Sequence, residues 1–231
     1  MSTIKVDTIT TRTGSGNITA SNTIAGDTTG THTGNIATNS ITTQSGTDIT
    51  VPTGKKIVVT DEGGVRVPGS VIQVVHSRFT TATVVAVDAF AYTGLSATIT
   101  PKSTSSKILV HGYLMGHGHN GSQEGHYFRL YRSIGGASDA HLTAADGVAA
   151  GARIGTIAHM PGLSGDDEGM QTIPYEYLDT PSTTSATVYK MYSRGYNSGS
   201  YYGYLNRSLQ DYDRYHNARG VCSMTLMEIA G

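Results

Sequence analysis

The chain has 231 residues, only 14% of them are charged, and its formal net charge is −1. Proteins that bind nucleic acid or anionic membrane surfaces normally carry a basic excess, so this balance argues against nucleic acid and a membrane surface as main partners. One cysteine, Cys222, excludes an intrachain disulfide framework, and the sequence lacks the long apolar runs of a signal peptide or membrane span.

Residues 1–66 have a composition of their own. They contain 18 Thr, no aromatic residue and no Leu, and their large apolar residues are Ile and Val at about one position in five. β-Branched residues alternate with polar ones in short runs that Gly, Asn and Asp interrupt, which predicts short strands joined by tight turns. Burying one Ile contributes roughly 1.5–3 kcal/mol, whereas ordering each residue costs about 1–2 kcal/mol. A single copy of this segment would therefore be unstable.

The simplest partner for segment 1–66 is a further copy of the same segment. Three chains around one axis would place each sparse Ile against two symmetry copies, and the small residues between would allow the backbones to approach closely. We therefore predict a Thr-rich extended β stalk in a homotrimer. A flexible Thr/Ser/Gly linker is the alternative.

Residues 67–231 are rich in short runs typical of strands. Pro68-Gly69 predicts a turn, and no later segment has a convincing helical period over three turns. The Ala/Gly-rich stretch 141–155 is compatible with a short helix or a close-packed crossover. Eight predicted strands lie within 67–79, 94–101, 106–116, 125–133, 152–160, 172–181, 186–195 and 220–231. This spacing predicts an all-β protein whose head is an antiparallel, jelly-roll-like β-sandwich.

Four segments resemble a known group of proteins. They read "TIKVDTITTRTGSGNITASNTIAG" (3–26), "TGLSATITPKSTSSKILV" (93–110), "YLDTPSTTSATVYKM" (177–191) and "SMTLMEIAG" (223–231). They resemble fibre-like structural proteins of tailed bacteriophages, closest in appearance to those of phages of marine bacteria and cyanobacteria. The resemblance implies a trimeric fibre with a virion-anchoring N-terminus and a β-sandwich head. It implies no particular receptor.

A Tyr-rich stretch, 189–220, is the most unusual part of the predicted head. Seven Tyr fall between positions 192 and 215, mixed with Asn, Ser, Gly, Asp and Arg. Such mixtures recur in recognition loops, because Tyr offers a broad contact surface at a low entropic cost. The alternative is a loop that packs its tyrosines on the sandwich or at a trimer interface. The candidate receptor-binding residues are Tyr196, Tyr201, Tyr202, Tyr204, Asn206, Arg207, Tyr212 and Tyr215.

Two other clusters have the residue types of metal sites. Stretch 111–126 holds four His, and its His117-Gly118-His119 element resembles an iron-binding element of some phage fibre tips. Imidazole suits transition metals, but a solvated loop between strands is the favoured interpretation. The three adjacent acids Asp166, Asp167 and Glu168 have the oxygen ligands of a weak Ca²⁺ site. Their spacing matches no EF-hand loop, so a solvated turn is the favoured interpretation. We expect no metal and no other cofactor.

An enzyme is disfavoured by the sequence. Glycoside cleavage needs a defined pair of carboxylates, and nothing in the sequence selects one among the acids at 166–168 and Glu176. No nucleophile elbow of the Gly-x-Ser-x-Gly type and no phosphate loop is present, and Cys222 lies in a predicted core strand. A polysaccharide depolymerase is therefore the weakest alternative.

The combined expectation is a trimeric virion protein, assembled in the cytoplasm of a bacterial host. Residues 1–66 would dock on another virion protein, with Ile4, Val6 and Ile9 as anchoring candidates. The head, 67–231, would bind a glycan or protein of the host surface, as a tail fibre does. The alternative is a capsid head fibre or decoration protein with a structural role.

Overall fold

The computed structural model describes residues 51, 53–60, 65–85, 88–118, 125–163, 165–195 and 202–231. The chain divides into two units, Met1–Ile57 and Val58–Gly231, and almost all of the described residues belong to the second. The predicted stalk strands before position 51 and the anchoring candidates Ile4, Val6 and Ile9 lie outside the described residues. Within the described part, we find no helix with the length and apolar character needed to cross a membrane.

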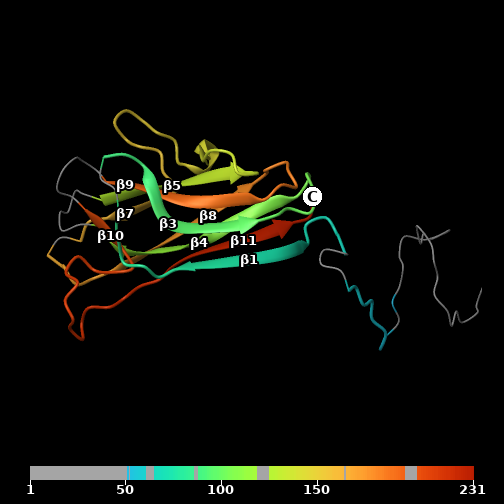
Figure 1. Cartoon of the computed structure of the whole chain (residues 1–231), viewed down its shortest axis with the longest axis horizontal. Coiled ribbons are helices and arrows are strands. Elements are labelled where there is room, and N and C mark those ends of the chain that lie inside the picture. Colours follow the sequence, from blue (N-terminus) through green and yellow to red (C-terminus); the bar gives the residue numbers. More distant parts are fainter. Residues whose placement is uncertain are drawn as a thin grey trace, which may run out of the picture. The chain divides into compact units, whose positions relative to one another are not determined.

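The described residues of the head form two antiparallel sheets and one short 3-10 turn, η1 (Figure 1). Sheet A contains β1 (Val71–Phe79), β2 (Thr83–Val85), β4 (Lys107–His117), β8 (Gln171–Asp179), β10 (Gly203–Leu205) and β11 (Cys222–Ile229). Sheet B contains β3 (Ala91–Ile99), β5 (Gly125–Ile134), β6 (Ala140–His141), β7 (Ala158–Pro161) and β9 (Thr187–Gly195). The turn η1 is Thr143–Ala145.

The order of the strands identifies the topology. Sheet A runs β1-β11-β4-β8, with the short β10 and β2 continuing beside β4, and sheet B runs β3-β9-β5, with β6 and β7 both along the free edge of β5. With the short strands β2, β6 and β10 set aside, consecutive strands alternate between the sheets except for β5 and β7, which are neighbours in sheet B, and this is the jelly-roll arrangement. The predicted all-β, jelly-roll-like sandwich is therefore confirmed for the head.

The period-two patterns of the sequence place the core between the sheets. Each long strand points alternate side chains inward, as β9 shows with five buried residues separated by four half-buried ones. The apolar core includes Leu95, Ile99, Ile108, Leu114, Phe128, Leu130, Tyr189, Met191, Met224 and Leu226. Cys222 is also buried there, as the sequence predicts.

Two of the sequence expectations need correction. Of the predicted strand at 152–160, only the part from Ala158 onward is a strand, because residues 151–157 form turns and bridges on the side of β5. The Ala/Gly-rich stretch 141–155, for which a short helix was one alternative, holds a single 3-10 turn. The short strands β2, β6 and β10 are absent from the prediction.

A buried polar cluster joins the two sheets. Asp179, at the end of β8 in sheet A, accepts hydrogen bonds from Arg132 Nη1 and from the Tyr189 hydroxyl, both in sheet B, each at 2.6 Å. Burial and the neighbouring Asp179 raise the pKa of Tyr189, so its hydroxyl stays a donor. Apolar packing is non-directional, whereas this cluster fixes how one sheet is placed on the other.

Asp179→Ala should lower the free energy of unfolding by about 3 kcal/mol, because it leaves the Arg132 charge and the Tyr189 hydroxyl without their acceptor. Asp139→Ala is the matched control, since Asp139 also accepts from a cation, Lys190 (2.6 Å), and a Tyr hydroxyl, Tyr192 (2.5 Å), but on the outer face of sheet B. That control should cost at most about 1 kcal/mol. Urea unfolding followed by circular dichroism measures both values, and equal values would contradict the role of the buried cluster.

Deleting the last eight residues, 224–231, should abolish folding of the head. The deletion removes most of β11, which pairs with β1 on one side and with β4 on the other and supplies Met224 and Leu226 to the core. The measurement is a thermal melt of the purified truncated chain. A soluble product with a cooperative transition would show that β11 is dispensable.

Candidate functional site

Strand ends gather at one end of the sandwich. β4, β7 and β9 end there, β5 and β8 begin there, and the short β10 pairs with the last residues of β4. At the other end, Gly69 N–H donates to the Ala230 carbonyl (2.8 Å), so the chain enters β1 beside its C-terminus. Figure 1 shows the loop that precedes β11 at the end of the sandwich far from the C-terminus.

An acidic turn forms one wall of the candidate site. Asp166 Oδ1 accepts from the backbone N–H groups of Glu168 (3.2 Å) and Gly169 (2.7 Å), which closes the turn. His117, the last residue of β4, is completely buried, and its Nε2 donates to the Asp166 carbonyl at 2.8 Å. The turn is therefore held on the end of sheet A.

The loop that precedes β11 forms the opposite wall. Gln210 binds Asp167 twice, through its backbone N–H to the Asp167 carbonyl (3.0 Å) and through Nε2 to Oδ2 (3.2 Å). His216 Nε2 lies 2.9 Å from Glu168 Oε1. The acidic turn and the loop that precedes β11, more than forty residues apart in sequence, are thus joined by contacts between nitrogen atoms of the loop and carboxylates of the turn.

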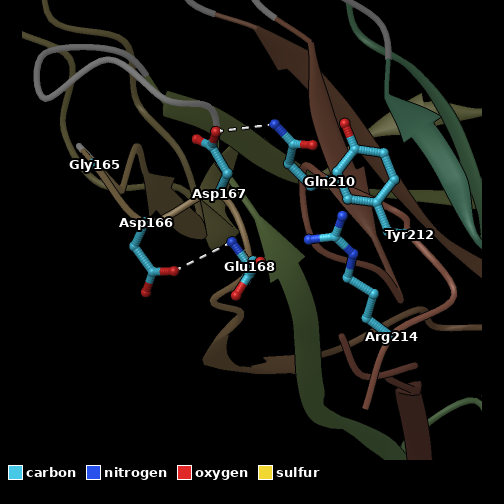
Figure 2. Close-up of a pocket in the computed structure, with 7 residues that line it drawn as sticks. All are labelled: Gly165, Asp166, Asp167, Glu168, Gln210, Tyr212 and Arg214. Atoms are coloured by element: carbon cyan, nitrogen blue, oxygen red, sulfur yellow. Dashed lines mark hydrogen bonds between the residues drawn. The ribbon is translucent and has the colours of Figure 1, made fainter. Parts of the chain in front are cut away.

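Between these walls lies an open depression of about 440 Å³. Figure 2 shows the acidic turn on one side and the segment from Gln210 to Arg214 on the other. The Arg214 guanidinium lies 4.9 Å from the centroid of the Tyr212 ring, within the range of a cation–π contact. The depression is lined by Gly165, Asp166, Asp167, Glu168, Gln210, Tyr212 and Arg214.

A second depression, of about 250 Å³, lies on the other side of Tyr212 and Arg214. Its wall includes Asp211, which accepts from Arg219 Nη2 at 2.9 Å. Tyr212 and Arg214 line both depressions, so they form a ridge with carboxylates on either side. Such a ridge offers an aromatic face, a guanidinium donor and carboxylate acceptors within one small surface.

The predicted receptor-binding residues fall into three groups. Tyr202, Tyr212 and Tyr215 are 43%, 53% and 100% exposed, and all three belong to the same chain segment as the ridge. Tyr204 is half-buried in β10, with the Arg207 guanidinium 4.5 Å from its ring centroid. Tyr196 and Tyr201 lie outside the described residues.

Asn206 and Arg207 serve the fold of the loop. Asn206 is completely buried, its φ is +61°, and Nδ2 donates to the carbonyls of Phe79 (2.8 Å) and Thr81 (3.0 Å). Arg207 donates to the carbonyls of Ser208 (2.9 Å) and Leu209 (2.6 Å). The proposed contact surface therefore excludes Asn206, which no ligand reaches.

The expectation of a solvated loop at His117-Gly118-His119 is wrong for His117, which is completely buried. His117 and His126 are buried at facing ends of β4 and β5, and His111 is half-buried in β4. His119 lies outside the described residues. Among the described residues, no three or more His, Cys, Asp or Glu side chains gather as a metal ion requires.

Sequence reasoning missed Gln210 and Arg214 as site residues, and it treated the acidic turn as a separate solvated feature. The local pattern of 162–170 gives no sign of what the turn contacts. The signal that does exist is electrostatic, because three adjacent acids need cations or amide donors nearby, and the stretch 207–219 supplies three Arg.

No family model matches the sequence, and no curated protein sequence matches it. Among solved structures, that of infectious bursal disease virus Gt strain is 10% identical, with a TM-score of 0.36, over 68% of this chain and 38% of that chain. That of the Gx strain is 12% identical, with a TM-score of 0.33, over 77% and 43%. This chain spans about two fifths of either. Because TM-scores this low carry no argument, the fold rests on the strand order of this chain itself.

Asn206→Ala should lower the free energy of unfolding by about 3 kcal/mol. The two hydrogen bonds to the carbonyls of Phe79 and Thr81 are lost, at about 1 kcal/mol each, and Ala at positive φ costs about 1 kcal/mol more. Asn206→Gly separates the two effects, because Gly tolerates positive φ, and should cost about 2 kcal/mol. Chemical unfolding measures both, and unchanged stability in both variants would refute the structural role.

Proposed function

We propose that the chain is a fibre-like virion protein of a tailed phage, whose head contacts a glycan or protein of the host surface. The observation that carries the proposal is the ridge of Tyr212 and Arg214 between two depressions with carboxylates in their walls. Sugar rings and peptide side chains pack on exposed aromatic faces, while Arg, Gln and carboxylates bind their polar groups. The ridge lies on loops at one end of a rigid sandwich, where binding residues are commonly found.

Trimerisation is part of the proposal. It is supported by the low apolar content of residues 1–66 and by the exposure of the apolar residues that the structure describes at the junction, such as Ile57 (70%) and Val58 (69%). Three copies would multiply one weak contact. Avidity then exceeds single-site affinity by orders of magnitude without tight individual sites, which permits reversible contact with the host before commitment.

A binding role accounts for the acids of the site better than catalysis does. Asp166 is engaged by the backbone of its own turn, Asp167 by Gln210 and Glu168 by His216. Glu176 is on sheet A, away from this turn in the paired part of β8. The jelly-roll fold occurs in viral capsid proteins and in lectins, but a fold alone does not assign a function. The ridge therefore carries the proposal.

Replacing Tyr212 and Arg214 together by Ala should reduce binding of the full chain to host cells roughly tenfold or more, as expected for a central aromatic and Arg pair. Tyr92→Ala is the matched control, because Tyr92 is a similarly exposed tyrosine on the outer face of sheet B. Binding of labelled protein to cells gives the readout, with circular dichroism to verify folding. Undiminished binding by a folded double variant would contradict the proposal.

The position on the particle has its own test. Antibodies against the head should label the tail of intact particles if the chain is a tail fibre. Labelling of the capsid would contradict the tail position and favour a capsid head fibre or decoration protein.

A further inference from the structure

One row of apolar side chains crosses the outer face of sheet A. Val74 pairs with Met227, Met227 with Leu109, and Leu109 with Leu178, so the four residues lie in direct register across β1, β11, β4 and β8. Their neighbours along each strand point into the core, so these side chains point outward. Val74 is 56% exposed and Leu178 is 46% exposed in the single chain. We call these four residues the apolar row.

The apolar surface continues on one side of this row, where Val71 and Ile229 form a cross-strand pair. On the other side a polar row of His76, Thr225, His111 and Glu176 follows, and the pair Tyr113 and Pro174 lies beyond it. Val71, Tyr113 and Pro174 are exposed. An exposed apolar patch of this kind often marks an interaction surface.

The charges on this face have no partners. Arg78 on β1, Lys107 on β4 and Glu176 on β8 form no ion pair or hydrogen bond within the part of the chain that the structure describes. His111 Nε2, on the same face, is buried and likewise unpaired. A buried polar atom without a partner costs roughly 1–3 kcal/mol, so a native structure normally supplies one.

Two cations on the outer face of sheet B have partners within the chain. Arg129 lies 3.0 Å from Asp146, and Lys190 lies 2.6 Å from Asp139. The Tyr131 and Tyr192 rings stack on one another with centroids 4.0 Å apart. These groups of sheet B are therefore engaged within one chain, although Arg194 Nε on β9 is buried without a partner. On sheet A, His76 binds Thr225 at 2.8 Å, whereas Arg78, Lys107 and Glu176 have no partner among the described residues.

We infer that the outer face of sheet A packs against a second copy of this chain, and that copies close into a ring of three. The inference deepens the proposed function and rests on its trimeric part. The arrangement of the unpaired charges supports this occupant, because Arg78 and Glu176 lie on opposite edge strands of the same face. In a three-fold ring each copy meets its two neighbours through different parts of its surface, so the β1 side of one copy meets the β8 side of the next. The ends of the apolar rows then cover each other, and Arg78 and Glu176, one cross-strand row apart in level, bring opposite charges to the same contact.

A disulfide between copies tests the arrangement in the full chain. Val74 and Leu178 lie three strand spacings apart in one copy, about 14 Å, and a disulfide needs Cα atoms within about 7 Å. The double variant Val74→Cys with Leu178→Cys can therefore form this bond only between chains. Cys222 does not compete, since it is buried and burial raises the pKa of its thiol to about 11.

After mild oxidation, the double variant should yield covalently linked pairs and triples on a non-reducing gel, and each single variant should remain unlinked. Linking by either single variant would overturn the contact between the β1 side of one copy and the β8 side of the next, because it requires the same residue of two copies to meet. Sedimentation of the wild-type chain distinguishes a wrong choice of contact face from a wrong prediction of the trimer. A wild-type trimer without linkage in the double variant overturns the choice of face alone, whereas a wild-type monomer overturns this inference and the trimeric part of the proposed function together.

Discussion

The pairing of β4 along both of its edges connects every part of the head to which we assign a role. One edge pairs with β11 and, further along, with β10, and the other pairs with β8. At Gly112 the absence of a side chain lets the Tyr175 hydroxyl pass over β4 and donate to the Ser223 carbonyl on β11 at 2.8 Å, which ties three strands together. The same strand ends at His117, which holds the acidic turn. A disturbance of β4 would therefore reach the core, the outer face of sheet A and the ridge at once.

The two outer faces differ in how their side chains are paired within one chain. On sheet B, Asp139 accepts from Lys190 and from the Tyr192 hydroxyl, and these contacts hold the pKa of the Asp139 carboxyl below its ordinary value. Burial and the same Asp139 raise the pKa of Tyr192 to about 12, so the hydroxyl remains a donor at all physiological pH values. Sheet A offers Val74 and Leu178 to solvent and leaves its charges unpaired.

The periodicity of the sequence was sufficient for the long strands and insufficient for the site. The alternation of apolar and polar residues predicted β1, β4, β5, β8, β9 and β11 closely, because each strand is long enough for that alternation to be recognised. The strands β2 and β10 have three residues each, too few for any period, and β10 exists because β4 extends past the end of β11. Composition alone singled out the Tyr-rich stretch but could not separate a buried amide, Asn206, from an exposed ring, Tyr212. The docking of the acidic turn on Gln210 is a long-range contact that no local pattern encodes.

The entry point of the chain gives the proposed assembly a direction. Residues that lead into β1 lie beside the C-terminus, and the ridge lies on loops at the opposite end of the sandwich. A head attached to a particle through residues before β1 would thus present the ridge away from its attachment. If the outer face of sheet A is turned toward neighbouring copies, the acceptors of sheet B and the loops of the ridge stay exposed around the ring. Three ridges would then be held at fixed separations, so a host surface with repeating sugar or protein units could engage them together, and the gain from multivalency would come from the rigidity of the sandwich and not from a flexible linker.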